Sequence, residues 1–266
     1  MSRIHSFTAK LKTFFGLAAT SIYPDSCVGC DELLEDREEI FCSHCQRAYL
    51  EATERECARC FRPRSRCICS RKSLEGAKIS RLVKLYTYRS GQVNLPQNRL
   101  IYALKHHHRS DVRRFLAQEL SAAISAGIGD LSHFVLTFAP RSKSAVIDDG
   151  YDHIEELAKE ISNILSLPLV FAIKRRKGGK IQKKLSYLDR QKNMKNRFYL
   201  DSGVEIKGKS ILVLDDIITS GATMMESARV LYENGAKEVV GVVIASTGRD
   251  EKRKPRRYSV KYRTMK

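Results

Sequence analysis

Residues 211–223 bring together side chains that could bind a small charged ligand. The run Ile211–Leu214 is apolar and rich in β-branched residues, which predicts a buried strand. Two carboxylates, Asp215 and Asp216, follow at the point where that strand is expected to end. An amphipathic helix is expected over residues 224–232. The loop between the acids and this helix consists of Thr219, Ser220, Gly221, Ala222 and Thr223.

The turn between this strand and the following helix is suited to a phosphate group. Free backbone N–H groups and the positive end of a helix meet there, and both favour an anion. Gly221 lets the backbone approach a ligand closely, and Thr219, Ser220 and Thr223 can add hydroxyl donors. Because Thr223 and Glu226 have the spacing of a capping box, we predict that the helix begins at Thr223.

The two carboxylates should face a different part of the ligand, because they repel a phosphate. Side chains of neighbouring strand residues point to opposite faces, so at most one of Asp215 and Asp216 is expected to remain in strand register. A phosphate at the turn, with hydroxyls or a bound cation near the acids, describes a sugar phosphate. The alternative is an ordinary strand-helix unit with an acidic loop.

The stretch resembles, position by position, the phosphoribosyl pyrophosphate signature of type I phosphoribosyltransferases. The resemblance implies that Asp215 and Asp216 hold the ribose 2′- and 3′-hydroxyls. It also implies that residues 219–223 cradle the 5′-phosphate.

The rest of the chain alternates between strands and helices, which implies a parallel or mostly parallel sheet covered by helices. We therefore predict an α/β fold, with the phosphoribosyltransferase-like domain over residues 80–248. Ligands bind such sheets beyond the carboxyl ends of the strands, where Arg141 is also expected to lie. The expected strands cover residues 82–88, 133–140, 211–214 and 239–245, and the expected helices residues 100–109, 115–126, 154–161 and 224–232.

All eight cysteines lie between residues 27 and 69, in four closely spaced pairs. Two such pairs can complete a tetrahedral shell of thiolates around zinc, and the polar segment would need the metal to fold. We expect one structural site from the first four cysteines and one from the last four, although an interleaved pairing stays open. Disulfides are the alternative, and nothing in the sequence suggests export. The predicted zinc ligands of this module, residues 24–72, are Cys27, Cys30, Cys42, Cys45, Cys57, Cys60, Cys67 and Cys69.

The remaining segments are basic. Residues 1–23 have the apolar spacing of an amphipathic helix, which could pack on its own domain or lie on a membrane surface. Residues 62–78 are predicted to be a linker, residues 171–198 a mobile lid or a solvated loop, and residues 249–266 a basic tail.

The net charge of the 266 residues is +18, which favours nucleic acid, phosphorylated metabolites or an acidic membrane surface as partners. No apolar run approaches the roughly 18 residues of a membrane-spanning helix. A cytoplasmic protein, peripheral to the membrane at most, is therefore expected.

The whole arrangement resembles the ComF family of competence-associated, phosphoribosyltransferase-like proteins, which join a cysteine-rich zinc module to a phosphoribosyltransferase domain. The resemblance covers residues 23–245 and includes Ala139-Pro140, Gly150-Tyr151 and the Asp-Asp loop. It implies a role in handling incoming single-stranded DNA. Where relatives tend to carry several arginines, this chain has Asp148-Asp149, which predicts a weaker pyrophosphate site on that side.

Two hypotheses follow. In the first, the protein is a phosphoribosyltransferase: Mg²⁺, Arg141 and Lys105 grip the pyrophosphate, and Asp215 and Asp216 stabilise positive charge at C1′. The acceptor is undefined. In the second, the fold senses phosphoribosyl pyrophosphate or a nucleotide without turnover, while the zinc module and basic loops contact DNA.

Overall fold

The computed structural model describes residues 26–35, 39–176 and 194–247. The helix expected over residues 1–23, the tail over 249–266 and most of the basic insert lie outside these ranges. Among the described residues, no helix is both long enough and apolar enough to cross a bilayer.

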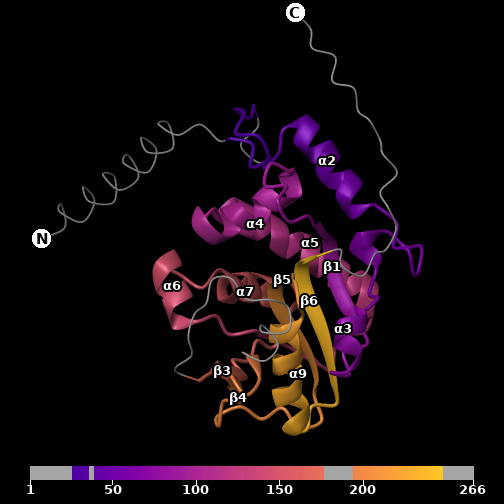
Figure 1. Cartoon of the computed structure of the whole chain (residues 1–266), viewed down its shortest axis with the longest axis vertical. Coiled ribbons are helices and arrows are strands. Elements are labelled where there is room, and N and C mark those ends of the chain that lie inside the picture. Colours follow the sequence, from indigo (N-terminus) through magenta and orange to yellow (C-terminus); the bar gives the residue numbers. More distant parts are fainter. Residues whose placement is uncertain (1–25, 36–38, 177–193, 248–266) are drawn as a thin grey trace, which may run out of the picture.

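A four-stranded parallel sheet forms the centre of the molecule, which confirms the α/β prediction (Figure 1). The strands lie in the order β1-β6-β5-β2, so that β5 is central and all carboxyl ends meet at one edge. A separate antiparallel pair, β3 and β4, packs against helix α9. The strands are β1 (Leu82–Tyr88), β2 (Phe134–Phe138), β3 (Ile173–Arg175), β4 (Phe198–Leu200), β5 (Ser210–Ile218) and β6 (Glu238–Thr247).

Helices cover both faces of the sheet, as the alternation along β5 requires. Leu212 and Leu214 join the cluster of apolar side chains that contains α5 and α7, whereas Ile211 and Val213 join the cluster that contains α9. Successive side chains of a strand point to opposite faces, so the unbroken apolar run 211–214 makes both faces of β5 apolar. The helices are α2 (Ser43–Thr53), η1 (Arg64–Arg66), α3 (Lys72–Glu75), α4 (Pro96–His106), α5 (Ser110–Ile128), α6 (Lys143–Asp149), α7 (His153–Leu165) and α9 (Ala222–Glu233).

The boundaries around the acid pair differ from those predicted. Strand β5 continues through both Asp215 and Asp216 to Ile218, since hydrogen bonding to β6 extends beyond the apolar run. Helix α9 begins at Ala222, with Gly221 as its N-cap, so the capping box predicted at Thr223 is wrong. The Glu226 side chain does not turn back to the cap, because it forms an ion pair with Arg229 instead.

The cysteine-rich segment shares a hydrophobic core with the sheet. The ring of Tyr49 on α2 is 1% exposed, lies 5.4 Å from the ring of Phe115 on α5 and 6.1 Å from that of Tyr86 on β1. Its hydroxyl donates to Glu119 Oε2 at 2.8 Å. The segment therefore packs on the domain and does not form a detached module.

The linker predicted over residues 62–78 is wrong. Arg71 is 7% exposed and the side chain of Leu74 is completely buried, so this segment is packed against the sheet. The basic composition is misleading here because a buried guanidinium can satisfy its charge with main-chain carbonyl oxygens.

Candidate functional site

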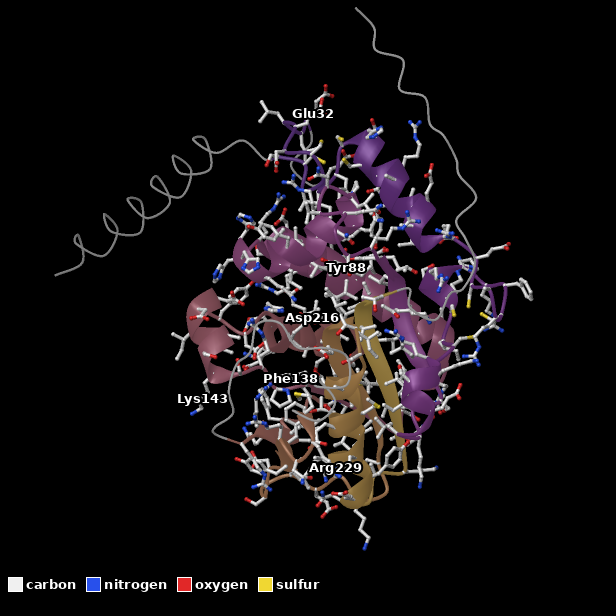
Figure 2. All side chains as sticks on the ribbon, in the orientation of Figure 1. Glu32, Tyr88, Phe138, Lys143, Asp216 and Arg229 are labelled. Atoms are coloured by element: carbon white, nitrogen blue, oxygen red, sulfur yellow. The ribbon has the colours of Figure 1, made fainter. Side chains whose placement is uncertain are left out.

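The carboxyl ends of the strands bring together residues from four parts of the sequence. Figure 2 shows Tyr88 at the end of β1, Asp216 near the end of β5 and Phe138 at the end of β2 along one line across the molecule. Helix α4 crosses above this edge, and its Lys105 forms an ion pair with Asp216 through Oδ2. Lys105, which was predicted to contact pyrophosphate, is therefore paired with one of the two acids in the structure.

Asp215 and Asp216 are adjacent, but their charge states differ. Burial, together with the neighbouring Asp216, raises the pKa of Asp215 to about 8. Burial also disfavours the charged form of Asp216, but Lys105 and His153 hold the pKa of that carboxyl far below its usual range. The site thus holds one firmly ionised acid and one that is poised to gain or lose a proton near neutral pH.

His153 is a site residue that sequence reasoning missed. Its side chain, at the start of α7, is completely buried, and its Nε2 lies 3.6 Å from Asp216 Oδ2. Neither ring nitrogen has a hydrogen-bond partner among the described residues. A signal was available, because Asp152 directly before it is the N-cap of α7, accepting from the N–H groups of Ile154 and Glu155. An aspartate N-cap in the sequence would have predicted that the helix begins at His153, close to the edge of the sheet.

Arg141 reaches the same edge but is already paired. Its guanidinium donates to Asp149 Oδ2 and to the main-chain oxygen of Tyr151, the latter at 3.2 Å. His106 Nδ1 lies 3.5 Å from the other oxygen of Asp149. Burial acts against ionisation of Asp149, but Arg141 outweighs it and lowers the pKa of that carboxyl. The departure noted at Asp148-Asp149 therefore places a carboxylate where a ligand phosphate would meet Arg141.

The loop between β5 and α9 leaves the start of a helix open. Gly221 has φ of +80°, a left-handed conformation that glycine adopts without strain. As the N-cap, Gly221 has no side chain that could accept from the N–H groups of the first helical turn. Ser220 Oγ accepts from the N–H of Ala222 at 3.3 Å, which shapes the turn. The start of a 12-residue helix whose N-cap is a glycine is suited to a phosphate.

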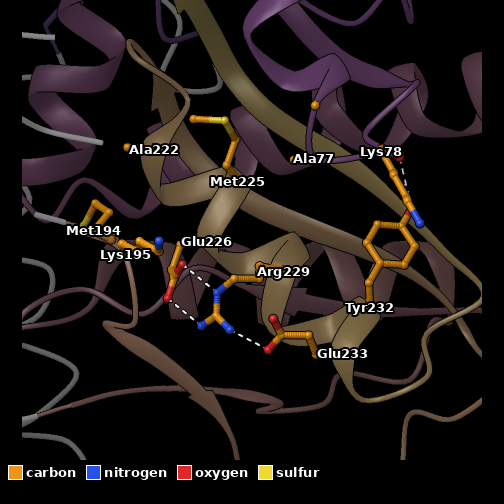
Figure 3. A pocket seen from close by; sticks show the side chains of 11 residues that line it. Ala77, Lys78, Met194, Lys195, Ala222, Met225, Glu226, Arg229, Tyr232 and Glu233 are labelled. Atoms are coloured by element: carbon orange, nitrogen blue, oxygen red, sulfur yellow. Dashed lines mark hydrogen bonds and ion pairs between the residues drawn. The ribbon is translucent and has the colours of Figure 1, made fainter. Parts of the chain in front are cut away.

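Two cavities lie near this part of the fold. One, of about 500 Å³, is lined by Tyr88, Asn98, Tyr102, Lys105 and Ile217, so it adjoins the acid pair. The other, of about 480 Å³, runs along α9 beside the ion pairs that Arg229 makes with Glu226 and Glu233 (Figure 3). Ala222 of the loop lines this second cavity but neither acid does, so the cavity adjoins the loop and not the acid pair.

The eight cysteines form two groups of four, as the sequential pairing predicted. Within each group the sulfur atoms lie within 4.8 Å of one another. All eight are free thiols, and the Sγ atoms of Cys30 and Cys42 are 3.7 Å apart, too far for a disulfide. Four sulfur donors at this spacing fit the tetrahedral shell of a structural zinc ion. The first cluster is Cys27, Cys30, Cys42 and Cys45, and the second cluster is Cys57, Cys60, Cys67 and Cys69.

Local hydrogen bonds prepare some of these sulfurs to carry charge. The N–H groups of Gly29 and Cys42 donate to Cys27 Sγ at 3.3 and 3.2 Å. Burial raises the pKa of the Cys57 thiol, but backbone N–H groups outweigh it and lower that pKa to about 6. Burial and the neighbouring thiols raise the pKa of Cys69 to about 12. All four thiols of a cluster would ionise together only around a cation such as zinc.

The chain is similar to phosphoribosyltransferases and to competence proteins. Residues 155–266 match the family described as "Phosphoribosyl transferase domain". Competence protein ComFC of Streptococcus pneumoniae is 24% identical, over 78% of this chain and 88% of its own. The DNA utilization protein YhgH of Escherichia coli strain K12 is 28% identical, over 74% and 86% of the two chains.

Other similarities cover a smaller share of the matched proteins. A ribose-phosphate pyrophosphokinase of Sulfurisphaera tokodaii is 30% identical, but the match spans only 36% of each chain. A solved hypoxanthine phosphoribosyltransferase of Staphylococcus aureus superimposes with a TM-score of 0.34 at 17% identity, over 54% of this chain and 67% of that one. With its parallel sheet, its two four-cysteine clusters and these competence-protein relatives, the chain is similar to the ComF family of phosphoribosyltransferase-like proteins.

Proposed function

We propose that the protein binds phosphoribosyl pyrophosphate together with Mg²⁺ at the carboxyl edge of the sheet, and that it acts in DNA uptake. The observation that carries this proposal is that the acid pair and a helix start capped by a glycine lie on one strand-helix connection. The ribose would lie against Asp215 and Asp216, and the 5′-phosphate against the loop of residues 219–223. The role in DNA uptake rests on the names of the competence-protein relatives.

The residues at the edge fit a magnesium complex of such a ligand. Mg²⁺ is usually held by one or two carboxylates together with substrate phosphates and water, and the edge offers Asp215 and Asp216. The ion would offset the negative charge of the pyrophosphate, while Lys105 and Arg141 supply nearby protein cations. Ribose hydroxyls or a cation beside Asp215 would favour the ionised form of that carboxyl.

In the transferase form of the proposal, an acceptor forms a bond to C1′ as the bond from C1′ to pyrophosphate breaks. The electron pair of that bond leaves with the pyrophosphate, and the two aspartates stabilise the positive charge that develops at C1′. The cavity of about 500 Å³ beside α4 offers space for an acceptor, joined to the acid pair by Lys105 and Ile217.

A second candidate function is a sensor that binds the same ligand without turnover. The observation that favours it is the ion pair between Arg141 and Asp149, which occupies a cation of the leaving-group side. Release of pyrophosphate across a panel of nucleobases and amines separates the two. Turnover with any member supports the transferase, and binding without release supports the sensor.

Calorimetry tests the binding proposal directly. We expect phosphoribosyl pyrophosphate to bind the wild type more tightly with Mg²⁺ than without it. The Asp215→Asn/Asp216→Asn pair should lose about 100-fold in affinity, roughly 2.7 kcal/mol, because two contacts to charged groups are removed. Equal binding by wild type and variant would show that the site is assigned wrongly.

The domain limits, a cytoplasmic location and contact of residues 1–23 with a membrane also remain proposals.

A further inference from the structure

Arg71 lies behind the loop between β5 and α9 and holds its main chain. The guanidinium Nη1 donates to the oxygens of Ile218 and Thr219 at 2.9 and 3.0 Å, and it lies 3.4 Å from Thr247 Oγ1. Arg71 is 7% exposed, so these bonds form in a protected environment where they are strong. Fixing two successive carbonyls also fixes the peptide planes that lead into the loop.

Helix α3, which follows Arg71, supports the next part of the same loop. A Cβ atom placed on Gly221 would lie 2.8 Å from Leu74 Cδ2 and 3.6 Å from Ser73 Oγ. Leu74 is completely buried. The residues just after the second cysteine cluster therefore contact the loop at Ile218, Thr219 and Gly221.

The second cluster in turn fixes the chain that leads to Arg71. The buried Lys84 of β1 donates to the main-chain oxygens of Cys67 and Cys69 at 3.3 and 3.0 Å, and its Nζ lies 3.5 Å from Cys67 Sγ. Arg59, between Cys57 and Cys60, donates to the oxygen of Ser70 at 2.7 Å. Arg71 follows Cys69 by only two residues, so its position depends on the cluster.

The first cluster has different neighbours. Tyr49, four residues after Cys45, bonds to Glu119 on α5, and Asp31, next to Cys30, forms an ion pair with Arg99 on α4 at 2.6 Å. The first cluster thus packs against α4 and α5. The two clusters offer a matched comparison, because they have the same ligand set and the chain that leaves the second cluster leads directly to Arg71.

We propose that the second cluster, when it holds its metal, positions the phosphate-binding loop through Arg71, and that the first cluster does not. The ligand part rests on the proposed function, whereas the effect on the loop does not. Arg71 acts as a positioning residue: it aims the amides of residues 219–223 and does not touch the ligand. Loss of Arg71 or of the second metal should therefore loosen this loop and weaken phosphate binding.

Hydrogen exchange of the zinc-loaded full-length protein without ligand tests the effect on the loop. We expect Arg71→Met to speed exchange of the amides of residues 219–223 at least tenfold, and Arg71→Lys to restore part of the protection. Arg99→Met, which removes an arginine beside the first cluster, should leave this loop unchanged. Unchanged exchange in Arg71→Met would overturn the proposal.

Cysteine variants separate the clusters. Cys60→Ser should speed exchange of the loop, whereas Cys30→Ser should speed exchange in α2 and leave the loop protected. Equal effects of the two variants on the loop would refute the assignment to the second cluster. If Cys60→Ser does not fold, Arg71→Met remains decisive, because it keeps all eight thiols and its zinc content can be measured.

Calorimetry with ribose 5-phosphate as the probe tests the consequence for binding. If the wild type binds the probe, Arg71→Met should weaken binding about tenfold while zinc content stays unchanged. Faster exchange with unchanged affinity would contradict a positioning role in binding. If the wild type does not bind the probe or phosphoribosyl pyrophosphate, the proposed function fails, and the exchange data alone decide whether the cluster supports the loop.

Discussion

Two adjacent carboxylates with opposite charge preferences dominate the site at the scale of single residues. Asp216 is kept ionised by Lys105 and His153, whereas burial raises the pKa of Asp215 to about 8. Such a pair can bind a cation or hydroxyl donors, since either would reduce the repulsion between the two carboxylates when both are ionised. Burial of Asp215 beside a second acid therefore lowers the stability of the folded protein when Asp215 is ionised.

This cost predicts that Asp215→Asn stabilises the protein without ligand. In the unfolded chain the pKa of an aspartate is about 3.9, so between about pH 4 and pH 8 the folded chain keeps a proton that the unfolded chain has released. Stability from this group is therefore present below about pH 4 and falls as pH rises towards 8.

We expect the variant to gain at least about 1.4 kcal/mol at pH 8, the value of one pKa unit. Urea unfolding of wild type and Asp215→Asn at pH 4, 6 and 8 measures this gain, which should grow with pH. Asp216→Asn is the matched control and should destabilise, because it leaves Lys105 without this acid. A gain that does not change with pH would contradict the explanation.

The ion pair between Asp149 and Arg141 predicts a gain in anion affinity on removal of the acid. In Asp149→Asn the Arg141 guanidinium keeps its hydrogen bond to Tyr151 but loses its carboxylate partner. A pyrophosphate then no longer has to displace that carboxylate from Arg141. We expect affinity for Mg-pyrophosphate, measured by calorimetry, to rise about 3- to 10-fold, or roughly 1 kcal/mol. Asp148 is exposed and directly precedes Asp149, so Asp148→Asn removes the same charge and should have a smaller effect. Equal gains would point to net charge alone.

At the scale of elements, the strand β5, its loop and helix α9 form the connection at which we propose that the ligand binds, and other elements hold it in place. Helix α4 brings Lys105 from above, α7 brings His153, and the segment before α3 brings Arg71 from behind. The loop itself is short and has a glycine at its turn, so its conformation depends on these supports.

The two cysteine clusters predict that the fold depends on metal. We expect two zinc ions per chain by elemental analysis, one in each cluster. Removal of the zinc with a strong chelator should cost several kcal/mol of stability, because the free energy of metal binding contributes to folding. Thermal unfolding with and without chelator, followed by re-addition of zinc, measures the effect. Fewer than two ions per chain, or stability that ignores the chelator, would contradict the assignment.

At the scale of the whole molecule, the chain joins a metal-stabilised segment and a sheet into one core and carries a net charge of +18. If the protein handles DNA, this charge predicts that single-stranded DNA binding depends steeply on salt. The logarithm of affinity should fall with the logarithm of salt by about 0.7 for each phosphate contacted. Fluorescence anisotropy of a labelled oligonucleotide between 50 and 200 mM NaCl, roughly the range in which such effects are large, measures the slope. Binding that does not change with salt would argue against an electrostatic DNA surface.

Much of the fold follows from local sequence patterns. The strand at 82–88, the two cysteine clusters and the order of strand, acid pair, loop and helix were all predictable, because each depends on residues close together in sequence. The helix start at Ala222 was not, since Glu226 prefers an ion pair with Arg229 to the expected cap.

The sequence by itself determined which chemistry the chain carries: twin acids before a hydroxyl-rich turn, and thiols at the spacing of zinc ligands. Only the tertiary structure decided which partners those groups meet. Lys105 and His153 reach Asp216 from over 60 residues away, and Arg71 reaches Ile218 from 147 residues away. No local pattern encodes such pairs, because packing of α4, α7 and the second cluster on a shared sheet creates them.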